Sequence, residues 1–269
     1  MAKYGIVIDC NKCVGCYNCF LTCRDEFCGN DYPGYAAAQP MEGQSWIKVI
    51  EKERGTYPEV VVSYYPVTCM HCENAACIKA AENGAVYRRP DGIVMIDPVK
   101  AKGQKQIVNA CPYRAISWNE ALQLPQKCIM CAHMLDAGEE VPRCVESCPS
   151  GALIFGDMDD PKSDIAKLLK EKQTEELHSE YGLREKVLYI GLPKKFVRGT
   201  VIYGDKDECA DGVEVALGGG GKSEKTTTDS FGDFEFDGLA DNTEYTVKVG
   251  KQELKACTKV DVYLGEIVI

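Results

Sequence analysis

The stretch CVGCYNCFLTC, residues 13–23, places four cysteines in the spacing C-x2-C-x2-C-x3-C. Two intervening residues form a tight loop that points successive thiolates at one centre, whereas the three-residue step starts a helix and turns the last thiolate away. In proteins the first three thiolates of this run bind one [4Fe–4S] cluster, and the fourth thiolate is a ligand of another cluster. The stretch therefore predicts that Cys13, Cys16 and Cys19 share an iron–sulfur cluster and that Cys23 serves a second one.

Two further groups of cysteines have related spacings. The pattern C-x2-C-x4-C at 69–77 is followed at a distance by Cys111-Pro112, and C-x2-C at 128–131 is followed by C-x3-C-P at 144–149. A proline after the outlying cysteine stops the helix beside the cluster, and Cys-Pro ends the bacterial ferredoxin run in the same way. Both groups therefore also predict iron–sulfur ligands.

The first motif recurs later in the chain in a reduced form. When it is shifted by 88 residues, Cys23 falls on Cys111. The three clustered cysteines fall instead on residues that cannot ligate iron as thiolates, namely Ala101, Gln104 and Ile107. The second copy thus keeps its outlying ligand and has lost its clustered ones.

The other two motifs are related by a shift of 67 residues. This shift matches Cys77 to Cys144, but Cys148 then has Ala81 as its counterpart. If each outlying cysteine serves the partner motif's cluster, Ala81 would have completed the same site that lost its three clustered cysteines. One whole site is therefore predicted to be missing, and three sites remain complete.

The remaining twelve cysteines form three crossed sets, which predict three [4Fe–4S] clusters. We call these sets group A (Cys13, Cys16, Cys19 and Cys148), group B (Cys23, Cys128, Cys131 and Cys144) and group C (Cys69, Cys72, Cys77 and Cys111).

Some cysteines and histidines near the motifs fit no ligand position. Cys10 and Cys28 are interpreted as packed thiols, and Cys209 and Cys257 lie outside the cluster region. Because no set lacks a cysteine, the histidines at 71 and 133 are expected to form hydrogen bonds near a cluster, with tuning of its potential as the alternative role. Zinc sites or disulfides could also use cysteines, but the x2, x2, x3 run and the two Cys-Pro ends favour iron–sulfur clusters.

Composition limits the possible partners and locations. The chain has 269 residues with 31 Lys and Arg against 41 Asp and Glu, a net charge of −10, which argues against nucleic acid or an anionic membrane. No apolar run approaches the roughly 20 residues that span a bilayer, and the N-terminus lacks a secretory signal. We expect a cytoplasmic protein with reduced thiols; the alternative is export in the folded state with a partner that carries a signal.

Cysteine content divides the chain, because fourteen of the sixteen cysteines lie before residue 149. We expect an iron–sulfur domain over 1–156, a helix and extended strap over 157–195, and a β domain over 196–269. The helix is predicted to start at Asp159-Asp160-Pro161 and to end at Gly182. Seven short alternating runs in the last segment predict a small β-sandwich.

Residues 1–156 resemble the iron–sulfur subunits that accompany molybdopterin oxidoreductases of the dimethyl sulfoxide reductase family. The three cysteine groups carry this resemblance. The lost fourth site, the string Cys69-Met70-His71-Cys72-Glu73-Asn74 and the β tail make it strongest to the small subunits of aromatic transhydroxylases. The resemblance implies an α+β fold, with a double bacterial-ferredoxin-like domain followed by a small all-β sandwich of the transthyretin-like or immunoglobulin-like type.

The same resemblance implies a function in electron transfer, with no catalytic residue in this chain. It implies a large catalytic partner in a heterodimer or larger complex, with a molybdenum or tungsten bis-pterin cofactor in that partner. The substrate class would be a phenolic or polyhydroxylated aromatic compound that undergoes transhydroxylation, dehydroxylation or hydroxylation.

Three alternatives remain open from the sequence. The partner could act on a non-aromatic substrate, the chain could be a freestanding polyferredoxin that serves several enzymes, or it could be a zinc-built interaction module. The strap and the β tail favour a fixed partner, because a diffusing carrier gains nothing evident from them.

Overall fold

A computed structural model describes residues 2–205 and 208–269, which form two compact units. The first unit comprises the described residues up to Glu51 together with Tyr64–Leu192. The second comprises Lys52–Ser63 and Pro193–Ile269. The helix and most of the strap that follow the cysteine-rich region thus belong to the first unit.

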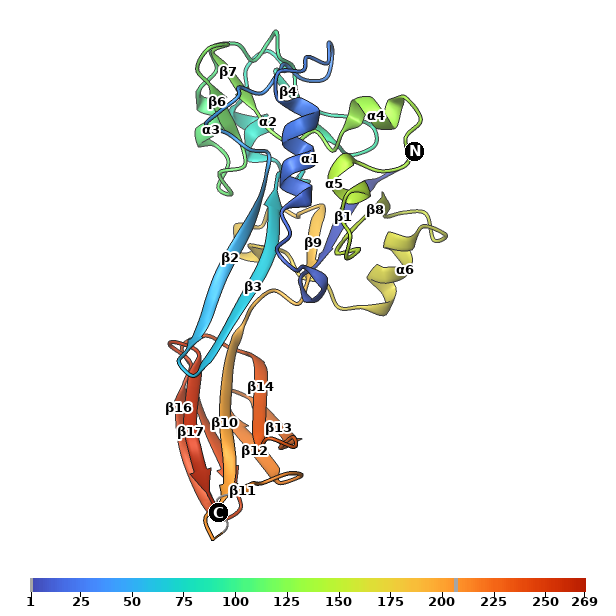
Figure 1. The fold of residues 1–269 in the computed structure, drawn as a ribbon. Helices are drawn as coiled ribbons and strands as arrows, with labels where there is room; N and C mark the ends of the chain where they lie inside the picture. The colour runs from blue at the N-terminus through green and yellow to red at the C-terminus, as the bar shows by residue number, and fades with distance from the viewer. Residues whose placement is uncertain (1, 206–207) are drawn as a thin grey trace. The chain divides into compact units, whose positions relative to one another are not determined.

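A three-stranded sheet lies in the first unit (Figure 1). Its central strand β1 (Tyr4–Asp9) pairs antiparallel with β8 (Leu153–Asp157) and parallel with β9 (Val187–Ile190). Ile6 and Ile8 of β1 are fully buried in the core that also contains the cysteine motifs. The sheet therefore joins the beginning of the cluster region to its end.

Short helices and hairpins surround the cysteines. The helices are α1 (Asn18–Phe27), α2 (Ala76–Ala80), α3 (Gln106–Asn109), α4 (Ala132–Asp136) and α5 (Arg143–Glu146), with a 3₁₀ turn at Cys10–Lys12. The small hairpins are β4 (Val86–Arg88) with β5 (Val94–Ile96) and β6 (Ser117–Asn119) with β7 (Leu124–Gln126).

The internal repeat predicted from the sequence is confirmed by these elements. Helix α3 starts 88 residues after α1, and α5 starts 67 residues after α2. Strands β4 and β5 pair antiparallel, as β8 and β1 do. Helix α1 contacts α5, and α2 contacts α3, so each early motif meets a late one. The two copies are therefore interleaved in space, as the crossed ligand sets require.

The predicted bounds of the long helix were wrong. Helix α6 spans Asp164–Glu171, because the Ser163 hydroxyl caps it by accepting a hydrogen bond from the Ala166 N–H at 3.1 Å. Beyond Glu171 the chain becomes extended, and Glu175 forms an antiparallel bridge with Tyr189 of β9. The backbone N–H and C=O groups of Glu175 are thereby paired with those of Tyr189 instead of with the preceding helical turn. A single 3₁₀ turn at Ser179–Tyr181 precedes Gly182.

Two four-stranded sheets make up most of the second unit. One contains β11 (Glu208–Cys209), β10 (Lys195–Tyr203), β14 (Asp233–Leu239) and β17 (Val262–Val268). The other contains β13 (Lys222–Thr227), β12 (Glu214–Gly219), β15 (Glu244–Val249) and β16 (Gln252–Cys257). Apolar side chains of both sheets are buried in one shared core, so the predicted all-β region is confirmed.

The sequence did not predict a long hairpin formed by β2 (Ile47–Thr56) and β3 (Glu59–Thr68). Its tip, Lys52–Ser63, belongs to the second unit. Within that unit the buried Arg54 guanidinium lies 3.1 Å from the Asp237 carboxylate. A tip segment from early in the chain is thus part of the late β region, which no local pattern could indicate.

Candidate iron–sulfur centres

Group A is assembled from the loop before α1, the first turn of α1 and the segment that follows α5. Gly15 and Tyr17 have left-handed backbone angles, φ 66° and 63°, that curl the loop between its cysteines. Burial, together with the other three members of group A, raises the pKa of Cys19 to about 12. The structure therefore brings Cys148 to the loop that carries the clustered cysteines.

The thiol of Cys148 differs from the others because several donors surround it. The Ala152 N–H donates to its Sγ at 3.3 Å, and the Ser150 hydroxyl lies 3.7 Å away. Burial acts to raise the pKa of this thiol, but hydrogen bonds from the Leu153 backbone, from Ser150 and from Ala152 outweigh it and lower the pKa below its usual value. The surroundings favour a thiolate, which is the form that binds iron.

Group B combines Cys23 of α1 with cysteines of the α4 and α5 segments. Met130 and Cys131 have left-handed backbone angles, φ 49° and 48°, just before α4 starts. Burial raises the pKa of Cys144, and the other three members of group B raise it further. The four thiols are therefore close neighbours despite their separation in sequence.

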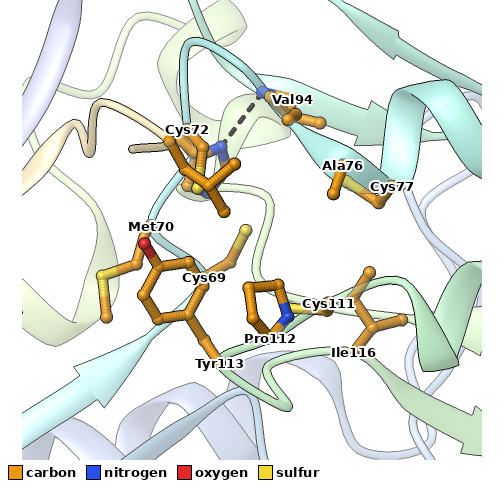
Figure 2. Close-up of a pocket in the computed structure, with 13 residues that line it drawn as sticks. Cys69, Met70, Cys72, Ala76, Cys77, Val94, Cys111, Pro112, Tyr113 and Ile116 are labelled. Carbon is orange, nitrogen blue, oxygen red and sulfur yellow. Dashed lines mark hydrogen bonds between the residues drawn. The ribbon is translucent and has the colours of Figure 1, made fainter. Parts of the chain in front are cut away.

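The four cysteines of group C line one pocket, together with Met70, His71, Tyr113 and several apolar side chains. Figure 2 shows these cysteines on separate segments around a common space. Burial, together with the neighbouring thiols of Cys69 and Cys111, raises the pKa of Cys72 to about 12 and that of Cys77 to about 11. The pocket contains thiols from both interleaved copies of the repeat.

Thiols of group B have electrostatic neighbours in both of the other groups. Burial raises the pKa of Cys128 in group B, and the next largest effect comes from Cys69 of group C. Cys19 of group A contributes likewise to the raised pKa of Cys144 in group B. Group B therefore has neighbours in both of the other groups.

A buried histidine and a buried lysine lie beside group C. His71 is 1% exposed, and its Nδ1 accepts a hydrogen bond from the Val94 N–H at 3.0 Å. Lys127 is also 1% exposed, and its ammonium donates to the Val94 carbonyl and, at 2.9 Å, to the Cys128 carbonyl. Burial holds the pKa of His71 well below its usual range, and the charges of Lys127 and Arg88 lower it further.

Sequence reasoning identified His71 but missed Lys127. It expected His71 to form a hydrogen bond near a cluster, and the bond to Val94 agrees with that expectation. Lys127 directly precedes Cys128, but a lysine beside a ligand is normally read as solvated. Only the packing around it shows that its charge is buried.

His133 forms a different kind of contact. Its Nε2 lies 2.9 Å from Glu26 of α1, whose carboxylate also accepts hydrogen bonds from Arg143 and from the Tyr32 hydroxyl. Burial opposes ionisation of Glu26, but these partners outweigh it and lower its pKa. This network ties α1, α4 and α5 together around group B. The sequence analysis did not single out Glu26.

The place of the predicted lost site is filled by protein. Ala101 and Ile107 are completely buried. The Gln104 side chain accepts a hydrogen bond from the Glu82 N–H at 2.9 Å and donates to the Lys100 carbonyl at 2.8 Å. Glu82 follows Ala81 directly. The segment of Ala81 therefore contacts the segment that contains Ala101, Gln104 and Ile107, the other three positions at which the repeat lacks a cysteine. An amide that bonds to the backbone stands where the repeat would have placed a ligand.

The surroundings of the cysteines fit four-iron clusters in chemical terms. All sixteen cysteines are free thiols, none falls on the undescribed residues, and each group offers four thiolate donors. Within residues 2–205 and 208–269, no three His, Cys, Asp or Glu side chains converge as they would around one metal ion. A four-iron cubane is larger than one ion, so its thiolates stand further apart. Cys10 and Cys28 are half-buried, and Cys209 and Cys257 are exposed.

Comparison with known proteins places the chain in a class and then in a family. Residues 60–158 match the 4Fe-4S dicluster domain. The chain is 43% identical to the pyrogallol hydroxytransferase small subunit of Pelobacter acidigallici, over 93% of this chain and 91% of that protein. It is 36% identical to an iron–sulfur subunit assigned to a dimethyl sulfoxide reductase of Halobacterium salinarum, over 71% and 79% of the two chains. It is 30% identical to the arsenate respiratory reductase iron–sulfur subunit of a Shewanella species, over 70% and 96%.

The protein is thus an iron–sulfur protein with a dicluster domain. It belongs to the iron–sulfur subunits of the dimethyl sulfoxide reductase family, and its function is electron transfer. The resemblance stated from the cysteine motifs is confirmed. In the described part of the chain, every helix is too short or too polar to cross a membrane.

Proposed function

We propose that groups A, B and C each hold one [4Fe–4S] cluster and that the chain relays electrons one at a time through these three clusters. When bound, the clusters supply the one-electron chemistry. The observation that carries the proposal is the Gln104–Glu82 contact: the only predicted site without cysteines is closed by a polar side chain, whereas the other three retain four thiols each.

The order of the relay follows from which thiols are neighbours. Group B shares neighbours with group A through Cys144 and Cys19, and with group C through Cys128 and Cys69. We therefore infer the series A–B–C, with group B in the middle. Group A contains the exposed Cys16, so electrons can enter or leave at its surface.

The chain's own residues hold and insulate the centres. Most group members are buried or half-buried, which excludes water from the thiolates. The backbone N–H of Ala152 donates to Cys148, and hydrogen bonds to sulfur are one determinant of cluster potential. The Glu26 network keeps α1 beside α5, and α1 carries ligands of both group A and group B.

The proposed partner is a larger subunit with a molybdenum or tungsten bis-pterin cofactor that acts on a polyhydroxylated aromatic substrate. Support comes from the 43% identity, over nearly the whole chain, to the small subunit of a pyrogallol hydroxytransferase. Bond making and breaking on the ring would occur in that partner. The reaction would be transhydroxylation, dehydroxylation or hydroxylation, with electrons supplied or removed through this chain.

Two finer assignments accompany this function. The first unit is inferred to be a double bacterial-ferredoxin-like domain, in keeping with its interleaved repeat. The two sheets of the second unit support a small transthyretin-like sandwich. We place the protein in the cytoplasm, where the twelve thiols of the three groups would stay reduced until they bind iron.

Anaerobic purification from the native cells, followed by metal analysis, tests the proposal. The chain should copurify with a larger subunit that contains molybdenum or tungsten and acts on trihydroxybenzenes. After separation, each copy of the chain should carry about twelve irons and as many sulfides. A count of about sixteen irons would contradict the lost site. A monomer that exchanges electrons with several reductases would identify a freestanding carrier, and a colourless zinc protein would overturn the cluster assignment.

A further inference from the structure

The backbone around His71 holds its imidazole in one place. His71 has a left-handed backbone angle, φ 45°, an uncommon conformation in which histidine is one of the enriched residue types. The Arg88 guanidinium donates to three successive carbonyls, those of residues 71–73. The imidazole lines the pocket of group C and is 1% exposed. Its position is therefore set by the surrounding protein.

The hydrogen bond to Val94 decides which ring nitrogen carries the proton. Nδ1 accepts the Val94 N–H at 3.0 Å, so it has no proton of its own. The neutral ring then carries its proton on Nε2, which becomes a donor. Nε2 is buried and has no hydrogen-bond partner among the residues that the structure describes. A buried donor costs free energy unless an acceptor lies beside it, and this ring faces a pocket lined by four thiols.

We propose that His71 donates its Nε2–H to a sulfur of the cluster held by group C, and that it thereby raises the reduction potential of this cluster. The inference rests on the proposed cluster at group C and adds a residue that is not a ligand. Reduction adds one electron to the cluster, and the N–H bond stays intact. Because the added charge falls partly on sulfur, a donor to sulfur stabilises the reduced state more than the oxidised state.

Lys127 acts in the same direction on this cluster. Its buried ammonium bonds to the carbonyl of Val94, the residue whose N–H orients His71. Val94 lines the pocket of group C, so the ammonium that bonds to its carbonyl lies beside this pocket. His71 and Lys127 therefore place a hydrogen-bond donor and a cation beside the pocket of group C.

The test compares two substitutions in the complete native complex. His71→Leu removes both ring nitrogens, whereas His71→Gln retains an amide N–H that can donate at the same reach. The signal of the group C cluster is assigned as the one lost in Cys77→Ala. Redox titration followed by electron paramagnetic resonance then measures all three clusters, so groups A and B serve as controls within each sample.

In His71→Leu, the equilibrium constant for reduction of the group C cluster should fall about tenfold, equivalent to about 59 mV for one electron. The other two should change by less than a factor of about two. His71→Gln should recover most of the loss. An exchangeable-proton coupling to the reduced group C cluster should be present in the native complex and in His71→Gln, and absent from His71→Leu.

An unchanged group C potential in His71→Leu, or an equal shift of all three clusters, would overturn the proposal. If His71→Leu loses iron, the test is made on the native complex labelled with 15N-histidine. The proposal then requires a coupling between the nitrogen label and the resonance signal of the group C cluster, and the absence of this coupling overturns it. If Cys77→Ala retains all three clusters, the assignment of Cys77 as a ligand is wrong and the proposed function fails. If Cys77→Ala loses one cluster but His71→Leu leaves its potential unchanged, only the proposed hydrogen bond fails.

Discussion

Individual backbone angles and single donors determine how the thiols of this protein face their centres. Gly15 is an example, since a Cβ there would lie 2.5 Å from the Tyr64 ring, and its φ of 66° suits glycine. Its place between Cys13 and Cys16 lets the loop turn sharply enough for both thiols to face one centre. Cys148 joins that centre from far along the chain and receives its own backbone donors.

The crossed assignment predicts an effect of Cys148 at a distance in sequence. Cys148→Ala should impair the group A cluster, because it removes the fourth thiolate from Cys13, Cys16 and Cys19, and it should leave the group B cluster in place. Iron content and the resonance signals of the reduced clusters measure this effect. Cys10→Ala is the matched control: it removes a half-buried thiol near group A and should cost no cluster. Selective loss of the group B signal in Cys148→Ala would show that the sets are not crossed.

Pairs of short elements, more than any long helix, build the cluster region. Helices α1 and α5 meet around groups A and B, and α2 and α3 meet beside group C. Helix α2 is only five residues long and α3 only four, so neither would persist alone. Thiolate–iron bonds would stabilise three of the four predicted sites. At the fourth, hydrogen bonds of Gln104 take that role.

Gln104→Ala should therefore destabilise the first unit. The Glu82 N–H and the Lys100 carbonyl would lose partners in a partly buried setting, at a cost of about 1–2 kcal/mol in the free energy of unfolding. Lys102→Ala, in the same segment but exposed, should cost less than about 0.5 kcal/mol. Denaturant unfolding of the cluster-loaded protein, followed by tryptophan fluorescence, measures both. Equal effects of the two substitutions would mean that Gln104 has no special role in closing the lost site.

The whole molecule consists of two units, each with its own apolar core. The core of the first unit includes cysteines of all three groups, so its stability should depend on bound iron. The core of the second unit is formed by aliphatic and aromatic side chains of its two sheets and contains no cysteine among the described residues. Both tryptophans, Trp46 and Trp118, belong to the first unit.

Removal of the clusters should therefore unfold the units differently. Oxidation with a chelator should lower the melting temperature of the first unit by at least ~10 °C, because the binding free energy of the clusters is lost. The melting temperature of the second unit should stay within about 2 °C of its starting value. Tryptophan fluorescence follows the first unit, and calorimetry follows both. A protease-resistant core that contains Pro193–Ile269 together with the hairpin tip Lys52–Ser63 should survive in the iron-free protein. Loss of both transitions together would show that the second unit depends on the first.

Spacing along the chain was enough to predict the ligand sets and the lost site and to indicate the strands of the β region. These features depend on spacing along the chain, since two residues between cysteines limit where their thiolates can point and alternation marks a half-buried strand. Only the tertiary structure decided where α6 ends, that the hairpin tip near Arg54 joins the late β region, and that Lys127 is buried. It also decided the proton position on His71, because the Val94 N–H that sets it comes from a strand 23 residues away. Burial and hydrogen-bond pairing depend on segments that meet only after folding, and no spacing within one segment encodes them.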